Sequence, residues 1–148
     1  MTLVIASTLL LGCAKFTEHS TGVVDGQLTN CPAWPRCVSS SSEDFEKQIA
    51  PFRILGDVDH AWAQAREALA AMERTRIANE GKNYLHAEVV SPWHVYTDDL
   101  ELLLRPAERR IDVRSSARIG YYDFNVNRDR VEALRDKLAE RGVVERGY

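Results

Sequence analysis

The sequence has no apolar run that approaches the roughly 20 residues of a membrane-spanning helix. It also has no excess of positive charge. Its formal net charge of −3 argues against nucleic-acid binding, which requires concentrated Lys and Arg. Gly-rich phosphate loops, nucleophile elbows and sequence-local Ser-His-Asp or Cys-His signatures are missing as well. These absences disfavour a transmembrane helix and nucleic-acid partners, and they leave the chain without a motif that identifies a reaction or a cofactor.

The composition is nevertheless that of a folded domain. The 148 residues are the length of one domain, and hydrophobic residues make up 45% of them. Because that fraction is ordinary for globular proteins, we expect a buried core rather than extended disorder.

The N-terminus carries a short apolar run, LVIASTLLL at residues 3–11, followed by Gly12 and Cys13. The run has the length of the hydrophobic core of a secretory signal, although no Lys or Arg precedes it. The ending Leu10-Leu11-Gly12-Cys13 resembles the lipobox of bacterial lipoproteins, in which a peptidase cuts before a cysteine that carries a diacylglycerol. We expect residues 1–12 to be a signal peptide and Cys13 to be the lipidation site. The alternative is a buried N-terminal strand with an incidental cysteine.

This N-terminus implies a location in the cell. Residues 13–30 are predicted to form a lipid-anchored tether, because they show no sustained hydrophobic period, and residues 31–148 to form a single α+β domain. The lipid would hold the protein on a membrane of the bacterial cell envelope, facing the periplasm. By the same resemblance, Ala14 after the lipidated cysteine favours the outer membrane.

Two further cysteines, Cys31 and Cys37, flank five residues that include two prolines. If Cys13 carries lipid, this pair remains, and an exported protein is expected to bridge it. Free thiols are the main alternative. A redox motif is disfavoured because the spacing differs from that of thioredoxin-like sites. A zinc site is disfavoured because no histidine lies close to these thiols in sequence.

Regular patterns predict two helices and four strands. Asp57 is the expected N-cap of a helix that runs to about residue 74, and Asn127 is the expected N-cap of a second helix that ends before Gly142. The predicted strands, in two hairpins, are residues 75–80, 84–91, 98–105 and 110–117. The expected fold is α+β, an antiparallel sheet of about four strands with both helices packed on one face.

Alternation along the strands separates an apolar face from a polar one. The residues predicted on the second face, called the polar face below, are Tyr84, His86, Glu88, Asp99, Glu101, Asp112, Arg114 and Ser116. A histidine and several carboxylates are residue types of metal sites and of acid–base catalysis. A solvated face with cross-strand ion pairs has the same composition, and Arg114 favours that interpretation. We therefore predict no metal site and assign no catalytic residue.

The densest polar stretch, RSSARIGYYDFNVNRDRVE at residues 114–132, lies between the last predicted strand and the second helix. Arg114 and Arg118 are four residues apart, so a regular strand places both on one side. We predict that at least one of them contacts a carboxylate through its planar fork. The candidate cluster, for ligand binding or for structure, consists of Asp98, Asp99, Glu101, Arg114, Arg118, Tyr121, Asp123 and Asn127.

Four stretches in order, CPAWPRCVSS, YLHAEVVS, DDLE and RSSARIGYYDFNVNRDRVE, resemble the "domain of unknown function 1499" family over residues 31–138. Its members include bacterial envelope proteins and plant plastid relatives. The chain departs from the family pattern at Arg36, at Ser116–Ala117 and at Asn125, where the family has glycine. Asparagine also adopts the left-handed conformation, so this turn can be kept. The resemblance supports the fold and the location, and it implies no activity.

Three functions remain open at this point. The first is a non-enzymatic envelope lipoprotein that binds a protein or a small anionic ligand through the polar face. The second is an uncharacterised enzyme, for example a hydrolase, that uses Asp98, Asp99, Glu101 and Arg118. It would require a closed pocket holding two carboxylates with raised pKa values. The third is a purely structural protein, in which these groups would be hydrogen-bonded to one another with no cavity nearby.

Overall fold

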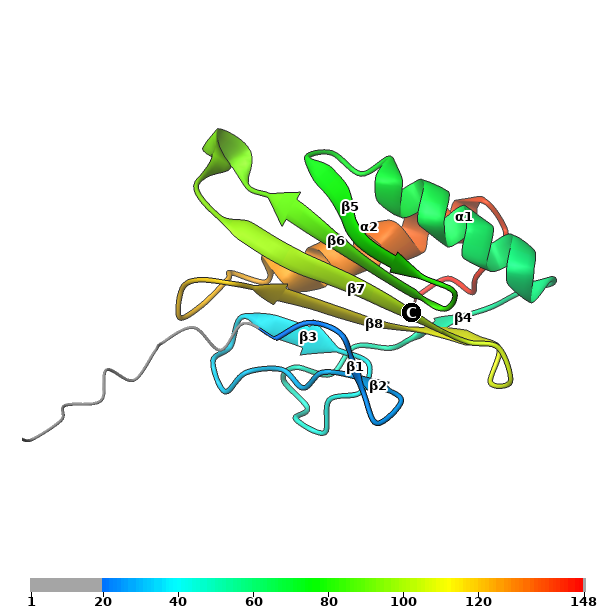
Figure 1. Cartoon of the computed structure of the whole chain (residues 1–148), viewed down its shortest axis with the longest axis horizontal. Coiled ribbons are helices and arrows are strands. Elements are labelled where there is room, and N and C mark those ends of the chain that lie inside the picture. Colours follow the sequence, from blue (N-terminus) through cyan, green and yellow to red (C-terminus); the bar gives the residue numbers. More distant parts are fainter. Residues whose placement is uncertain (1–19, 148) are drawn as a thin grey trace, which may run out of the picture.

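A six-stranded antiparallel sheet forms the centre of the computed structural model, which describes residues 20–147 (Figure 1). The strands follow the order β3-β8-β7-β6-β5, and β4 also pairs with β8. Their bounds are β3 Cys37–Ser39, β4 Phe52–Arg53, β5 Thr75–Gly81, β6 Tyr84–Val90, β7 Thr97–Arg105 and β8 Arg110–Ala117. A separate two-stranded hairpin consists of β1 Val23–Val24 and β2 Gln27–Leu28.

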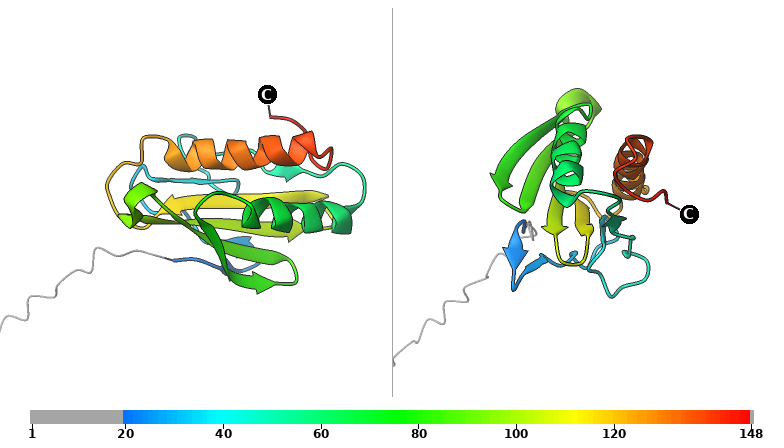
Figure 2. Two further views of the ribbon diagram at one scale, coloured as in Figure 1. Left: turned by 90° about the horizontal axis from the view of Figure 1, so that it is seen from above. Right: turned by 90° about the vertical axis from the view of Figure 1, so that its right-hand side faces the viewer.

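Helices α1 (Val58–Ala70) and α2 (Val126–Glu140) cover one face of the sheet (Figure 2). α2 packs on β8 and β3, and α1 packs on α2 and β5. The alternate residues of the long strands, such as Leu100, Leu102 and Val113, are fully buried between sheet and helices. The α+β fold with both helices on one face is confirmed, and the four predicted strands agree with β5 to β8 within one residue at each end.

The sheet is larger than the four strands expected from the sequence. β3 and β4 pair with opposite ends of β8, at Ser116 and Ile111 respectively, and so extend its outer edge. Because these strands have three and two residues, they are too short to show a hydrophobic alternation.

The helix ends show one confirmed cap and one correction. The Asp57 side chain accepts a hydrogen bond from the His60 amide, as expected of the N-cap of α1. Asn127 is not the cap of α2, which begins at Val126 after Asn125 in the left-handed conformation (φ 65°). The carboxylate of Asp123 performs the capping role, because it accepts hydrogen bonds from the amides of Asn125 and Asn127.

Residues 20–30, the described part of the predicted tether at residues 13–30, include the β1–β2 hairpin. The β1–β2 hairpin lies across β7 and β8 on the face opposite the helices, and Leu28 is 2% exposed. The predicted signal peptide and Cys13 lie outside the described residues. Among residues 20–147, no helix is both long and apolar enough to cross a bilayer.

Candidate functional site

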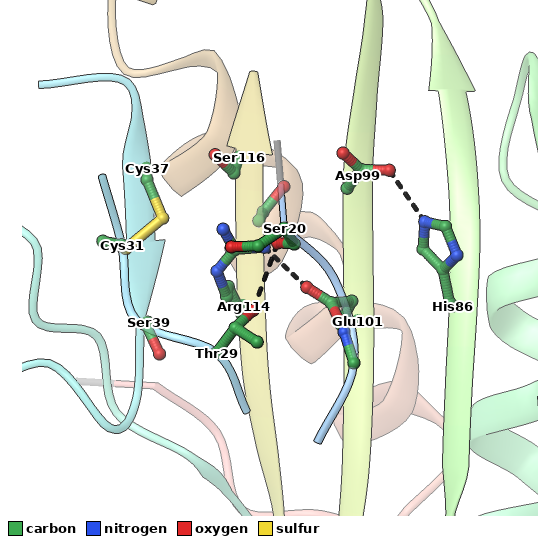
Figure 3. Close-up of polar contacts among 12 residues, drawn as sticks. Ser20, Thr29, Cys31, Cys37, Ser39, His86, Asp99, Glu101, Arg114 and Ser116 are labelled. Carbon is green, nitrogen blue, oxygen red and sulfur yellow. Dashed lines mark hydrogen bonds and ion pairs between the residues drawn. A yellow bond between two sulfur atoms is a disulfide. The ribbon is translucent and has the colours of Figure 1, made fainter. Parts of the chain in front are cut away.

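The polar face is a ladder of charged side chains on β6, β7 and β8. Cross-strand neighbours place His86 beside Glu101, Glu101 beside Arg114, and Asp99 beside Ser116. Figure 3 shows these side chains projecting to one side of the three strands, with the chain around residues 20–30 passing over them. The face is therefore covered in its centre rather than open to solvent.

The centre of the ladder is the ion pair of Arg114 and Glu101. Arg114 Nη1 lies 2.6 Å from Glu101 Oε2, and both side chains are almost completely buried. Glu101 Oε1 also accepts hydrogen bonds from the Tyr84 hydroxyl and the Gly22 amide. Burial and the bond to this carboxylate raise the pKa of Tyr84. Together these contacts join β6, β7 and β8 to one another and to the segment that leads into the β1–β2 hairpin.

A second group gathers around Asp99, which is 1% exposed. The Arg118 guanidinium donates to both oxygens of Asp99 through Nε and Nη2, and its Nη2 also lies 2.8 Å from Glu88 Oε1. His86 Nε2 lies 2.7 Å from Asp99 Oδ1. Hydrogen bonds from Arg118 lower the pKa of Glu88, and those to Asp99 raise the pKa of Arg118. The predicted contact between an arginine and one of the named carboxylates is thus present twice, at Arg114 and at Arg118.

The candidate cluster does not form one site. Glu101 and Arg114 lie under the hairpin, and Asp99 and Arg118 lie beside them on the same face. Asp98 faces the helix side, where its carboxylate pairs with Arg130 of α2 at 2.8 Å. The remaining three residues, Tyr121, Asp123 and Asn127, lie in or after the loop between β8 and α2.

Asn127 is a buried connector at the start of α2. Its side-chain amide donates to the Arg36 carbonyl and to Asp123, and its oxygen accepts from the Ser115 hydroxyl. Arg36 in turn donates to the carbonyls of residues 118 and 120. The disulfide between Cys31 and Cys37, with sulfurs 2.06 Å apart, encloses Arg36 and is confirmed. Reasoning from sequence missed Arg36 because an isolated arginine in a proline-rich loop carries no periodic signal.

A cleft of about 610 Å³ opens on the helix side, between the end of α1, the ends of β6 and β8, and the start of α2. Its walls are mostly apolar and include Val89, Val90, Ala117 and Val126. The residues that follow β6 and β8 extend these walls with Tyr96, Ile119, Tyr122 and Phe124. We call this end of the sheet, formed by residues 91–96 and 118–126, the loop end.

The Asp98–Arg130 pair supplies polar groups to the cleft wall. Both side chains are largely buried, with 13% and 11% of their surfaces exposed. Burial raises the pKa of Asp98 above its ordinary value, and Arg130 partly offsets this effect. Arg130 also donates to Ser115 and Asn127, so its guanidinium is held in place. Sequence reasoning named Asp98 but missed Arg130, which the helical period places on the inner side of α2.

The residue types of the polar face do not form a metal-binding group. Within residues 20–147, no set of three or more His, Cys, Asp or Glu side chains is arranged to hold a metal ion. Arginines stand between the carboxylates instead, so opposite charges are neutralised within the face.

Comparison with protein families agrees with this architecture. A family model described as a protein of unknown function (DUF1499) matches residues 27–138, which is most of the chain. The chain belongs to this family. The match begins at Gln27, inside the hairpin, so it includes part of the segment that covers the polar face. A search among curated proteins found no match to the chain. Because the family description names no activity, the function is argued below from geometry.

Proposed function

We propose that the protein is a lipid-anchored lipoprotein of the bacterial cell envelope whose domain binds an amphiphilic molecule without catalysing a reaction. The cleft of about 610 Å³ at the loop end is the observation that supports binding. Its volume falls within the range of small-molecule sites, roughly 300–1,000 Å³. The lipobox-like ending at Cys13 supports anchoring, with the domain facing the periplasm and the outer membrane favoured.

The cleft suits a ligand with two chemically different parts. Val89, Ala117 and Val126 offer an apolar wall for a hydrocarbon or ring system. One oxygen of Asp98 is held by Arg130, and within the described residues the other has no hydrogen bond from the protein. A hydroxyl or amine on the ligand head would satisfy that oxygen. The cationic groups of the polar face are already engaged with carboxylates, which makes the polar face a weaker candidate for an anionic ligand.

The geometry gives less support to the two other functions. An enzyme that uses paired carboxylates would need two of them poised in one pocket. Asp98 lines the cleft with a raised pKa, but the neighbouring Asp123 caps α2 through both oxygens. A purely structural role explains the hydrogen-bonded polar face well. It does not explain an apolar cleft on the other side of the sheet.

A cleft-filling substitution tests the binding function. Ala117→Trp adds a large side chain to the cleft wall, because Ala117 lies opposite Asp98 on the helix side of the sheet, and Val24→Trp adds the same side chain to the exposed hairpin on the opposite face. With the full-length protein and a fluorescent naphthylamine amphiphile as probe, we expect Ala117→Trp to weaken binding at least about tenfold, ~1.4 kcal/mol. Val24→Trp should bind as the wild type does.

Solvent extraction of protein purified from its native envelope provides the second measurement. Mass spectrometry should find an amphiphile with the wild type and with Val24→Trp, and not with Ala117→Trp. Equal probe affinity in all three proteins, each with a cooperative melting transition, would show that the cleft is not the binding site.

A further inference from the structure

Exposed hydrophobic side chains are concentrated at the loop end. Among the described residues, thirteen large hydrophobic side chains are exposed, and eight of them lie within residues 93–96 and 119–126. Trp93 is 90% exposed and Phe124 is 80% exposed, and Tyr121 and Ile119 are 66% and 64% exposed. We call these eight side chains the aromatic rim. A cluster of this size is unusual on a protein surface that contacts only water.

The backbone holds the tips of both loops in an unfavourable conformation. Trp93 and His94 have φ values of 69° and 55°, and Phe124 and Asn125 have φ values of 55° and 65°. Bulky side chains rarely adopt this left-handed conformation. Strained positions of this kind tend to occur where a residue has a function. Trp93 and Phe124, the two most exposed residues of the rim, both have this left-handed backbone conformation.

The rim carries little charge that would have to leave water. Residues 91–96 contain His94, and residues 119–126 contain Asp123. The Asp123 carboxylate already accepts hydrogen bonds from two amides at the start of α2. Transfer of this surface from water to an apolar boundary would therefore desolvate few unpaired ions.

The described chain begins over the polar face, on the half of β8 that leads to the loop end. The Thr29 hydroxyl donates to the Ser20 carbonyl, and Cys37, which is bridged to Cys31, lies opposite Ser116 near the end of β8. Figure 3 shows Ser20 over β8, between the levels of Arg114 and Ser116. Six residues lie between Cys13 and Ser20, and the seven steps from one Cα atom to the other span at most about 25 Å when extended. A lipid on Cys13 would thus keep the loop end close to the membrane.

We propose that the aromatic rim is a docking surface for a lipid bilayer, with Trp93 and Phe124 inserted at the level of the head groups. Trp and Tyr are favoured at that level because they combine an apolar ring with a polar group. The argument from chain length rests on the proposed lipidation of Cys13, whereas the arguments from composition and charge do not. Docking would turn the mouth of the cleft, which shares Tyr96, Tyr122 and Phe124 with the rim, toward the lipids.

A pair of matched phenylalanines tests the docking surface. Phe45 is 88% exposed, and it lies in the connection between β3 and β4, outside the rim. In full-length Cys13→Ser protein, which cannot be acylated, Phe124→Ala should weaken sedimentation with phosphatidylethanolamine–phosphatidylglycerol vesicles about tenfold. Phe45→Ala should have no effect. Because all these proteins share one N-terminus, any binding by the apolar run at residues 3–11 cancels in the comparison.

Tryptophan quenching locates the contact independently. Trp93 follows β6, whereas Trp62 donates to the Lys82 carbonyl in the turn before β6, at the other end of that strand. In vesicles with brominated acyl chains, a variant that keeps only Trp93 should be quenched, and one that keeps only Trp62 should not.

Three outcomes would overturn the proposal: equal vesicle binding by Phe124→Ala and Phe45→Ala, unquenched Trp93, or concentration-dependent dimers that Phe124→Ala abolishes. The last would assign the rim to a second copy of the chain. Failure of lipidation would appear in the mass of the N-terminal peptide, and failure of cleft binding in the Ala117→Trp titration. Neither of these results changes the vesicle comparison between the two phenylalanines.

Discussion

Arg118 is the residue at which a ligand-binding and a structural interpretation of the polar face give opposite expectations. Its fork bridges Asp99 and Glu88, and it does not line the cleft. Arg118→Lys keeps the charge but loses the fork. We expect the free energy of unfolding to fall by about 1–2 kcal/mol, several degrees in melting temperature. Amphiphile affinity should stay unchanged, and a loss of affinity at constant melting temperature would contradict the structural role.

Glu88 provides a pH test of the same contact. Because Arg118 lowers the pKa of Glu88, the folded protein binds the Glu88 proton less readily than the unfolded chain does. The stability due to this pair is therefore fully present above the ordinary value of 4.5 and is lost as the pH falls through the lower folded value. Urea unfolding should show wild type more stable than Glu88→Gln at neutral pH. This difference should shrink toward about pH 3, and a difference that is constant or grows on acidification would exclude the linkage.

At the scale of elements, the disulfide and its loop form a brace for the start of α2. The bridged loop is short, so the chain-entropy model gives the bond about 2 kcal/mol. Arg36 inside the loop donates to the carbonyls of residues 118 and 120, and these hydrogen bonds do not involve the sulfur atoms. We expect Cys31→Ala/Cys37→Ala to lose about 2 kcal/mol in urea unfolding and to remain folded. Complete loss of the cooperative transition would show that the bond contributes far more than loop closure.

The sequence predicted β5 to β8 closely because each has seven or more residues, each hairpin has a short turn, and apolar residues recur at alternate positions in β6 to β8. The same alternation placed Glu101 and Arg114 on the polar face correctly. It did not predict their burial, because the hairpin that covers them comes from residues far away in the chain. The cleft was missed for a similar reason, since it forms where two helices, two strand ends and two loops meet. Local periodicity in the sequence does not show which distant elements come into contact.

At the scale of the whole molecule, the proposed lipid anchor would determine where in the cell the domain works. Cys13→Ser should abolish acylation, because serine has no sulfur to carry the diacylglycerol. Mass spectrometry of the envelope fraction should find a lipid-modified N-terminal peptide in the wild type and none in the variant. An unmodified wild-type N-terminus that begins at Met1 would contradict the lipoprotein assignment, although the cleft and rim experiments would still apply.

The hairpin over the polar face has a consequence for the order of folding. Gly22 donates to Glu101, 79 residues later in the sequence, and Arg114 donates to the carbonyl of Asn30, 84 residues away. Contacts between such distant segments form late, because the chain must first close a large loop. The first described segment of the chain is therefore expected to be the last to dock, and the charges of β7 and β8 stay hydrated until it does.

Leu28, which the hairpin buries, makes this order measurable. Leu28→Ala should cost about 2 kcal/mol, and a contact made after the transition state changes unfolding alone. Stopped-flow kinetics should show unfolding about 30-fold faster and refolding at the wild-type rate, whereas slower refolding would place the hairpin in the folding nucleus. Late docking also makes this segment the first to detach when the domain unfolds. Mechanical force applied to the N-terminus would therefore remove the hairpin from Glu101 and Arg114 before it disturbed the helices.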